Sequence, residues 1–299
     1  MAHARAVRSA TTQALDRQPQ LLIVQGDTSS AFGAALAAFN AAVPVAHVEA
    51  GLRSHDPRLP WPEEEYRIAI DREAQLLFAP TSGAAANLRA ERVRGTIHVT
   101  GNTGIDALLA AESRLPARRL NERSKPVILV TCHRRESWRD GLDSIASGLR
   151  QLAEAGKCLI QFVVHPNPVV RARMEQALAG QANISFLEPC DHLELLTRLR
   201  DADLVLSDSG GIQEEAPTLG VPLLVLRDKT ERPEGIASGN CRLVGTSTDQ
   251  IVAETLRLLD DPVQLAAMSR RSLPYGDGRA APRISAIIKE WLESADRRW

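Results

Sequence analysis

The chain is poor in cysteine and has no long apolar segment. It holds four cysteines among 299 residues, with no Cys-X-X-Cys pair, which argues against structural zinc and a disulfide framework. No run of about 18 apolar residues is present to span a bilayer. The N-terminus also lacks the continuous apolar region of a secretory signal. We therefore expect a cytoplasmic protein without a metal site or a membrane partner.

An excess of charge of either sign is also missing. The formal net charge is -1 at pH 7, so the chain has no bulk attraction for nucleic acid or anionic lipid. We predict no nucleic-acid partner, and any anionic ligand must be held by local groups. A hydrophobic content of 44% and a charged content of 24% match a globular protein, and 299 residues suffice for two domains.

Short apolar runs recur along the chain between longer segments of helix-like composition. Strands that are apolar on both faces and separated by helices form parallel sheets covered on two sides. The sequence therefore predicts an α/β fold. The runs are QLLIVQG, VPVAHVEA, LLFAP, TIHVTG, PVILVT, LIQFVVH, ISFLEP, DLVLSD and PLLVLR.

The segment AESRLPARRLNERSK is polar and contains a proline, as expected of a linker between compact units. We predict an N-terminal domain over residues 1–118, a C-terminal domain over 119–278, and an amphipathic helix over 279–299 that packs back on the first domain. The first half offers only four good strands and opens on a helix-like stretch. We therefore expect a first domain that is truncated at its N-terminus.

Three acidic residues of the first half follow apolar runs or open a helix. Asp27 ends LIVQGD, Glu49 ends VPVAHVE, and Glu63 comes directly after Pro62. Ligands of parallel sheets bind beyond the carboxyl ends of the strands, so we expect these carboxylates at one sheet edge. Crowded carboxylates have the perturbed pKa values that acid-base chemistry at carbon requires.

Each of these acids also has an ordinary structural explanation. Asp27 can cap the helix that follows it, a role that Thr28 and the next two serines can also fill. Glu49 can pair with Arg53 or His47, and an acid at the position of Glu63 complements the helix dipole. The residues alone leave these alternatives open, and only the convergence of the three favours a site.

Basic residues collect at strand ends in the second half. The run VILVT leads into Cys132, His133 and Arg134, and a protonated histidine and an arginine suit phosphate oxygens. His165 has the equivalent position after LIQFVV. It is the weaker candidate, because a lone histidine at a strand end is more often structural.

The segment DLVLSDSGGIQEEAPTLG is the most informative one. Ser209, Gly210 and Gly211 allow a backbone to approach closely, and the helix N-terminus that follows is an anion site. A glycine pair before a helix is a weak signal alone, since it can serve only the turn. Glu215 can accept hydrogen bonds from ribose hydroxyls, and Arg232 adds a cation after the next strand. A phosphate-bearing ligand is the best single explanation.

These segments resemble the non-hydrolysing UDP-N-acetylglucosamine 2-epimerases. The shared motifs keep the family's order: QGDTSS, HVEAGLRS, WPEEEYR, FAPT, VTGNTGID, TCHRRES, VHPNP, SDSGGIQEEAPTLG, RDKTERPEG and PYGDG. The resemblance implies a fold of the glycosyltransferase-B type, with two Rossmann-like domains facing a cleft. Family members usually begin with a strand and a GTRPE-like loop, and neither is found in this sequence.

The resemblance also implies an activity, the interconversion of UDP-GlcNAc and UDP-ManNAc. UDP is eliminated together with the C2 proton, and it re-adds after the proton returns to the opposite face, without a nicotinamide or other cofactor. A homodimer that supplies ManNAc for surface polysaccharide is implied as well. The matching catalytic positions are Asp27, Glu49, Glu63 and His133, and the matching UDP-binding positions are Ser209, Gly210, Gly211, Glu215 and Arg232, beside Arg134.

Two other functions stay open at the level of sequence. A glycosyltransferase can use the same two-domain scaffold, because a fold does not determine a function. The second alternative is a truncated protein that binds UDP through its second half and performs no chemistry. An epimerase needs the three acidic residues Asp27, Glu49 and Glu63 of the first half. A glycosyltransferase or a protein that only binds UDP does not need all three.

Overall fold

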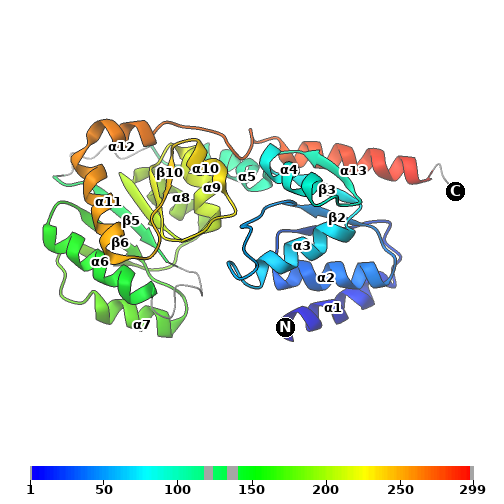
Figure 1. Ribbon diagram of the computed structural model, residues 1–299, viewed down its shortest axis with the longest axis horizontal. Helices are drawn as coiled ribbons and strands as arrows, with labels where there is room; N and C mark the ends of the chain where they lie inside the picture. The colour runs from blue at the N-terminus through cyan, green and yellow to red at the C-terminus, as the bar shows by residue number, and fades with distance from the viewer. Residues whose placement is uncertain (1, 118–123, 133–140, 297–299) are drawn as a thin grey trace. The chain divides into compact units, whose positions relative to one another are not determined.

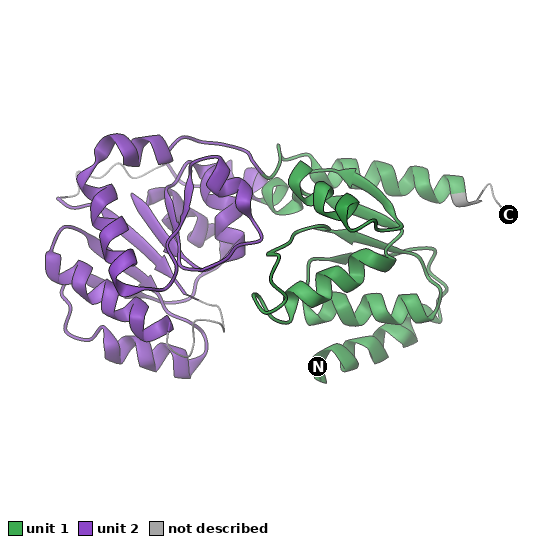
Figure 2. Ribbon diagram, viewed as in Figure 1, with its two compact units in different colours: residues 1–107, 275–299 green, residues 108–274 purple. Residues whose placement is uncertain are grey.

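The computed structural model describes residues 2–117, 124–132 and 141–296 (Figure 1). The chain divides into two compact units, residues 1–107 with 275–299 and residues 108–274 (Figure 2). Each unit is built on a parallel sheet with helices. The predicted α/β class is therefore confirmed.

The first unit contains a four-stranded parallel sheet in the order β1-β2-β3-β4. The middle strands β2 and β3 are buried along their whole length, which explains why their sequences are apolar on both faces. The strands are β1 Leu22–Gln25, β2 Val45–Val48, β3 Leu76–Ala79 and β4 Thr96–Val99. The preceding and connecting helices are α1 Ala2–Leu15, α2 Ser29–Asn40, α3 Glu63–Glu73 and α4 Ser82–Ala90, and α5 Thr103–Glu112 leads into the second unit.

Helix α13, Ala280–Asp296, returns to the first unit after the chain has passed through the second. Its residues Ile284, Ile287, Ile288 and Trp291 pack in one cluster with Phe78 and other strand residues of β2 and β3. A separate apolar cluster contains residues of α2 and α4. The sheet is thus packed on both faces, and α13, which lies within the predicted range 279–299, forms part of the core of the first unit.

The second unit contains a six-stranded parallel sheet in the order β10-β9-β8-β5-β6-β7. The strand order reverses at the neighbouring strands β5 and β8, and the crevice at such a point is where open α/β sheets bind ligands. Thr131 and Ser207, the last residues of these two strands, share a hydrogen bond of 2.6 Å between their hydroxyl oxygens. The strands are β5 Val127–Thr131, β6 Leu159–Val163, β7 Ile184–Leu187, β8 Leu204–Ser207, β9 Leu223–Val225 and β10 Cys241–Leu243.

The helices of the second unit enclose its apolar core. Residues of α6, α7 and α11 join the strands in one cluster of buried side chains. The helices are α6 Gly141–Ala155, α7 Pro168–Ala177, α8 His192–Asp201, α9 Gly210–Leu219, α10 Pro233–Ala237, α11 Thr248–Asp260 and α12 Pro262–Met268. Helix α9 directly follows β8, so its N-terminus lies at the point where the strand order reverses.

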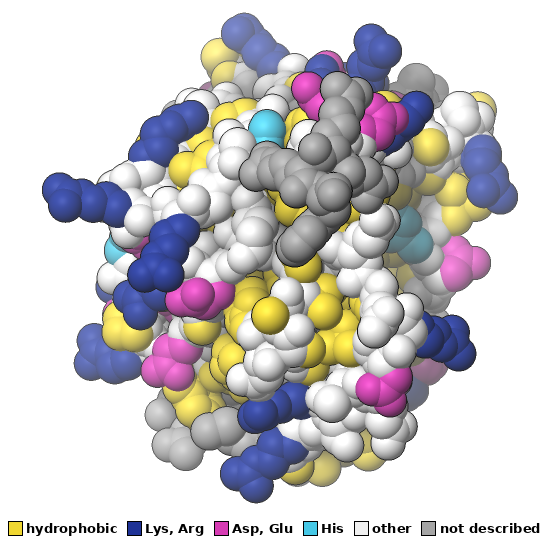
Figure 3. All heavy atoms as spheres, turned by 90° about the vertical axis from the view of Figure 1, so that its right-hand side faces the viewer, with side chains coloured by type: hydrophobic (Ala, Val, Ile, Leu, Met, Phe, Trp, Pro, Cys, Tyr) yellow, Lys and Arg dark blue, Asp and Glu magenta, His cyan; other side chains and the backbone are white. Residues whose placement is uncertain are grey.

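Strand β1 forms an edge of the first sheet, and its Ile23 side chain is 53% exposed. Hydrophobic side chains gather in the middle of the face that Figure 3 views, and most Lys and Arg side chains lie toward its margin. In the part of the chain that the structure describes, no helix is both long and apolar enough to cross a membrane.

Candidate active site

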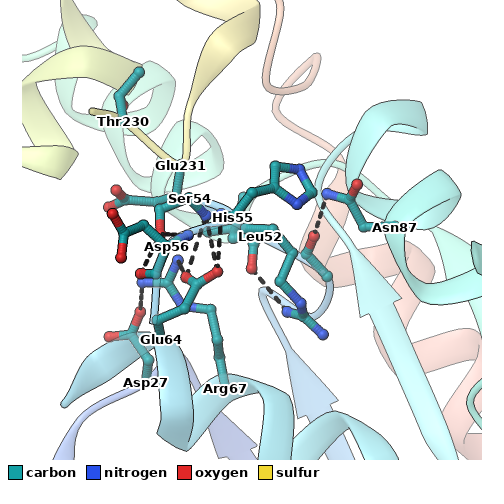
Figure 4. Close-up of polar contacts among 12 residues, drawn as sticks. Asp27, Leu52, Ser54, His55, Asp56, Glu64, Arg67, Asn87, Thr230 and Glu231 are labelled. Carbon is teal, nitrogen blue, oxygen red and sulfur yellow. Dashed lines mark hydrogen bonds and ion pairs between the residues drawn. The ribbon is translucent and has the colours of Figure 1, made fainter. Parts of the chain in front are cut away.

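Asp27 lies in the turn between β1 and α2. Thr28, not Asp27, is the N-cap of α2, because its hydroxyl accepts a hydrogen bond of 3.1 Å from the backbone N–H of Ala31. The capping explanation of Asp27 is therefore wrong. Its carboxylate instead forms an ion pair with Arg67 on α3 (Figure 4).

Arg67 is a buried cation held between two carboxylates. Its second partner is Glu64, one helical turn earlier on α3, at 3.1 Å. Glu64 is itself buried and accepts hydrogen bonds from the backbone N–H groups of Ser54 and His55, at 3.0 and 3.2 Å (Figure 4). Glu64 therefore anchors the loop after β2 to α3, while Arg67 fixes the direction of the Asp27 carboxylate.

Glu49 follows β2 and has a backbone φ of 67°, in the left-handed region that costs a residue with a side chain about 1 kcal/mol or more. Its carboxylate accepts hydrogen bonds from Asn102 at 3.2 Å and from Gln25 at 3.4 Å. A Cβ on Gly26 would lie 3.2 Å from the nearer Glu49 oxygen, so this carboxylate lies against the turn that carries Asp27. Asp27 and Glu49 thus occupy neighbouring turns.

The expected partners of Glu49 bind other groups. Arg53 pairs with Asp71 at 2.8 Å and with Glu91 at 2.7 Å, and His47 pairs with Asp71. The pairing explanation of Glu49 is therefore wrong. A left-handed backbone at a residue with a side chain is a feature that functional sites share, although it does not identify a reaction.

Glu63 is the first residue of α3 and is half-buried. Among the described residues it forms no hydrogen bond or ion pair, in contrast with Glu64 beside it. The structure therefore brings Asp27 and Glu49 together on neighbouring turns, and leaves Glu63 at the N-terminus of α3 without a bond to either.

In the second unit, Ser209 is the N-cap of α9, and its hydroxyl accepts a hydrogen bond from the N–H of Ile212. Arg232 lies across this N-terminus, since a Cβ on Gly210 would be 2.7 Å from its Nη1 atom. Arg232 also pairs with Glu214 at 2.5 Å. Among the described residues, a Cβ on Gly211 would contact the Ser209 hydroxyl alone, at the ordinary van der Waals distance of 3.9 Å, so the backbone there is not crowded. These features form a cradle suited to an anion.

Glu215, one turn into α9, accepts a hydrogen bond of 2.8 Å from His192 at the start of α8, provided that Nε2 of the ring carries the proton. Burial raises the pKa of Glu215, although the hydrogen bond and charge of His192 act in the opposite direction. A carboxylate at this position can accept a hydrogen bond from a hydroxyl group of a ligand bound at the α9 N-terminus.

The other candidate groups of the second unit differ in their environments. His133 and Arg134 lie outside the described residues. Nδ1 of His165 accepts a hydrogen bond of 2.9 Å from the N–H of Asn167, the N-cap of α7, so this ring has a local structural role. Cys132 donates to Asp208 at 3.4 Å, and burial raises the pKa of the thiol well above its ordinary value. Cys132 is therefore unsuited to act as a nucleophile.

Comparisons with known proteins assign the chain to a family. Residues 2–289 match the family model described as UDP-N-acetylglucosamine 2-epimerase. The chain belongs to the UDP-N-acetylglucosamine 2-epimerase family. The resemblance inferred from the motifs is thus confirmed.

Named epimerases are similar to this chain over most of its length. A probable UDP-N-acetylglucosamine 2-epimerase of Ralstonia solanacearum is 45% identical over 288 residues, covering 92% of this chain and 77% of the relative. The UDP-N-acetylglucosamine 2-epimerase of Salmonella typhimurium is 43% identical, covering 93% and 78%. The crystal structure of the Neisseria meningitidis enzyme bound to UDP-GlcNAc has a TM-score of 0.91 at 37% identity, covering 96% and 81%.

Four polar residues in the sites of this epimerase-family chain were not among the candidates predicted from sequence. Arg67 and Glu64 are three apart on α3, so their spacing could have predicted a shared helix face. His192 is the first residue of α8, directly after the N-cap Asp191, and this position at a helix start could have indicated it. Asn102, by contrast, reaches Glu49 across 53 positions of the sequence, and no local pattern indicates that contact.

Proposed function

We propose that this protein interconverts UDP-GlcNAc and UDP-ManNAc by eliminating and re-adding UDP. The observation that carries the proposal is the placing of Asp27 and Glu49 on neighbouring turns in a member of the epimerase family. An inversion at C2 requires that a proton leave one face of the sugar and return to the other. Two carboxylates from adjacent strand ends are suited to the two transfers.

The proposed elimination proceeds as follows. A carboxylate removes the C2 proton, the C2–H electron pair forms the C1–C2 double bond, and the C1–O bond breaks to release UDP. The bound 2-acetamidoglucal is then protonated at C2 from the opposite face, and a UDP oxygen attacks C1. We assign the proton transfers to Asp27, Glu49 and Glu63, with Arg67 holding Asp27 in one direction.

The nucleotide part of the substrate is assigned to the second unit. The Ser209-capped N-terminus of α9, with Gly210, Gly211 and Arg232, would hold the diphosphate, and Glu215 would accept a ribose hydroxyl. His133 and Arg134, which lie outside the described residues, would add cations to the departing diphosphate. These residues would lower the activation barrier of the elimination by stabilising the negative charge that develops on UDP as the C1–O bond breaks.

Incubation of the purified protein with UDP-GlcNAc in deuterium oxide, without any added cofactor, tests the proposal. The expected result is a mixture with UDP-ManNAc in which both sugars carry deuterium at C2, measured by proton NMR and mass spectrometry. Asp27→Asn should abolish the conversion while UDP binding, measured by calorimetry, persists, because its UDP-binding residues lie in the second unit.

A folded wild-type protein that binds UDP and leaves UDP-GlcNAc unchanged would overturn the epimerase proposal in favour of a binding protein. Transfer of the sugar to an added acceptor, without C2 exchange, would instead identify a glycosyltransferase. Conversion without deuterium at C2 would overturn the elimination step alone.

We also propose a cytoplasmic homodimer that feeds ManNAc into surface polysaccharide. The nucleotide-sugar substrate and the resemblance to the family support this part of the proposal. Light scattering after size-exclusion chromatography measures the mass in solution, to be compared with 32.5 kDa for one chain. A single chain at micromolar concentration would contradict the dimer.

A further inference from the structure

A buried set of charged residues lies directly beneath the turns that carry Asp27 and Glu49. His47 of β2 and Asp71 of α3 are both fully buried, and their Nδ1 and Oδ1 atoms are 2.6 Å apart. The other ring nitrogen of His47, Nε2, is 3.0 Å from the carbonyl oxygen of Gly26. In the sheet, His47 stands between Val24 and Leu77, which carry no charge.

The protonation state of the His47 ring follows from these two hydrogen-bond partners. A carboxylate oxygen and a backbone carbonyl oxygen can only accept, so both ring nitrogens must donate and the ring is a positively charged imidazolium. Burial by itself lowers the pKa of His47, but the charge and hydrogen bond of Asp71, the Gly26 carbonyl and the charge of Glu49 together raise it. The contacts and the electrostatics therefore agree.

Asp71 connects the imidazolium to the second turn. Its Oδ2 atom accepts a hydrogen bond of 3.1 Å from the backbone N–H of Gly51 and pairs with Arg53 at 2.8 Å. Arg53 pairs in turn with Glu91. Two cations and two anions thus neutralise one another, which a buried charge requires if it is to be tolerated.

The two backbone groups held in this way lie beside Asp27 and Glu49, two of the three carboxylates to which we assign proton transfer. The Gly26 carbonyl immediately precedes Asp27, and the Gly51 N–H lies two residues after Glu49. Both turns contain a backbone in the left-handed region, at Gly26 and at Glu49, each with φ of 67°. At Glu49, which carries a side chain, such a backbone persists only where the surrounding structure holds it in place.

We propose that His47 and Asp71 are positioning residues that orient Asp27 and Glu49 for the reaction at C2, through the Gly26 carbonyl and the Gly51 N–H. The inference rests on the proposed function for its catalytic meaning. Neither residue touches the substrate, and their effect is on the direction of the two carboxylates. A misplacement of about 1 Å at such groups can cost on the order of 100-fold in rate.

Two replacements of His47 distinguish a role in orienting the carboxylates from an effect on folding stability alone. The amide nitrogen of glutamine reaches the place of Nε2, and that of asparagine reaches the place of Nδ1. His47→Gln therefore keeps a donor for Gly26 and His47→Asn loses it, although both variants lose the same buried positive charge. The matched control is His98→Gln on β4 of the same sheet, a residue outside the proposed machinery.

We expect His47→Asn to lower kcat about 10- to 100-fold with KM for UDP-GlcNAc within about threefold of wild type, and His47→Gln to retain most of kcat. The two variants should have similar melting temperatures. Equal kcat losses in both, or losses that follow the melting temperature, would overturn the proposal. His98→Gln should keep the wild-type kcat.

The pH profile gives an independent measure. When the wild-type ring loses a proton, the remaining one stays on Nδ1 facing the Asp71 carboxylate, so Gly26 loses its donor and kcat should fall at alkaline pH. His47→Gln cannot titrate and should lack this alkaline decline, whereas His98→Gln should retain it. An identical decline in the wild type and His47→Gln would count against the proposal.

A third measurement does not depend on catalysis. In protein with ¹⁵N-labelled histidine, both ring nitrogens of His47 should be protonated at pH 7.5, with the signals assigned by their loss in His47→Gln. A neutral ring at that pH overturns the inference even if the enzyme is active. Absence of epimerisation in the wild type, with the ring charged, overturns the proposed function and leaves the buried charge standing.

Discussion

The guanidinium of Arg67 forms an ion pair with the carboxylate of Asp27, across 40 positions of the sequence. Arg67 is 2% exposed, whereas Asp27 is partly open to solvent. A buried cation therefore holds an acid whose other face remains accessible. Such an arrangement orients a reactive group without enclosing it.

Arg67→Met should therefore affect both stability and activity. It leaves the buried Glu64 carboxylate without its cation, and breaking a buried pair in this way costs about 3–5 kcal/mol. Urea unfolding measures the loss, and kcat should fall at least tenfold because Asp27 is no longer oriented. Lys289→Met is the control, since the side chains of Lys289 and its partner Glu293 are 79% and 56% exposed, and its replacement should change stability by less than about 1 kcal/mol. Equal unfolding free energies for the two variants would contradict the prediction.

Gly210→Ala should weaken UDP binding and also lower stability. The new methyl group would lie 2.7 Å from Nη1 of Arg232, and the guanidinium can move away only by weakening its ion pairs with the buried carboxylates of Glu214 and Glu231. That movement takes a cation from the α9 N-terminus, and we expect the dissociation constant for UDP to rise about tenfold, equivalent to roughly 1.4 kcal/mol. Isothermal titration calorimetry provides the measurement. An unchanged dissociation constant would show that Arg232 does not act on the ligand.

The affinity for UDP should depend on pH through Glu215. Burial raises the pKa of Glu215, so the carboxylate becomes protonated at a higher pH than an exposed glutamate, and affinity should decline as the pH falls through that value. His192 opposes the shift, and His192→Ala should move the decline to higher pH. Calorimetric titrations between pH 4.5 and 8 measure both curves. A decline at the same pH in both proteins would contradict the role of His192.

The free energy of unfolding should depend on pH through the protonation of the two buried partners His47 and Asp71. The raised pKa of His47 means that its contribution is fully present below the unfolded value of 6.5 and is lost as the pH rises through the folded value. Burial alone raises the pKa of Asp71, but His47 and Arg53 lower it, so its contribution is present above 3.8 and is lost as the pH falls through the folded value.

The free energy of unfolding, measured with urea across this range, should therefore be highest between about pH 4 and pH 6.5 as far as this pair contributes. His47→Gln should be less stable than wild type within that window and should not show the alkaline decline. A wild-type stability that increases between pH 7 and 9, with no such decline relative to the variant, would contradict the assignment.

The sequence predicted the sheets well because buried parallel strands leave a simple apolar signal. Strands such as β3 and β5 are buried at every position, and the matching runs LLFAP and PVILVT were recognised. Strand β10 was not recognised, since it has only 3 residues and contains Arg242. So short a run has no periodicity to distinguish it from a loop.

The sequence predicted the site only for residues whose positions are set by the order of the strands in the sheet. Asp27 and Glu49 come together because β1 and β2 are neighbouring parallel strands, so their carboxyl ends meet at one edge. The ion pairs between different elements were not predictable, because they depend on how the helices pack against the sheet. Arg53 pairs with Asp71 on α3 and with Glu91 at the end of α4, in place of Glu49, as a result of that packing.

The return of α13 to the first sheet has a consequence for how the protein is made. Residues 108–274 are contiguous and can fold as soon as they leave the ribosome, whereas the first unit needs Ile284 and Trp291 to cover one face of β2 and β3. Until α13 has been synthesised, that face of β2 and β3 has no helix packed against it. The unit translated first is thus the one completed last, and it carries the carboxylates on which the proposed chemistry depends.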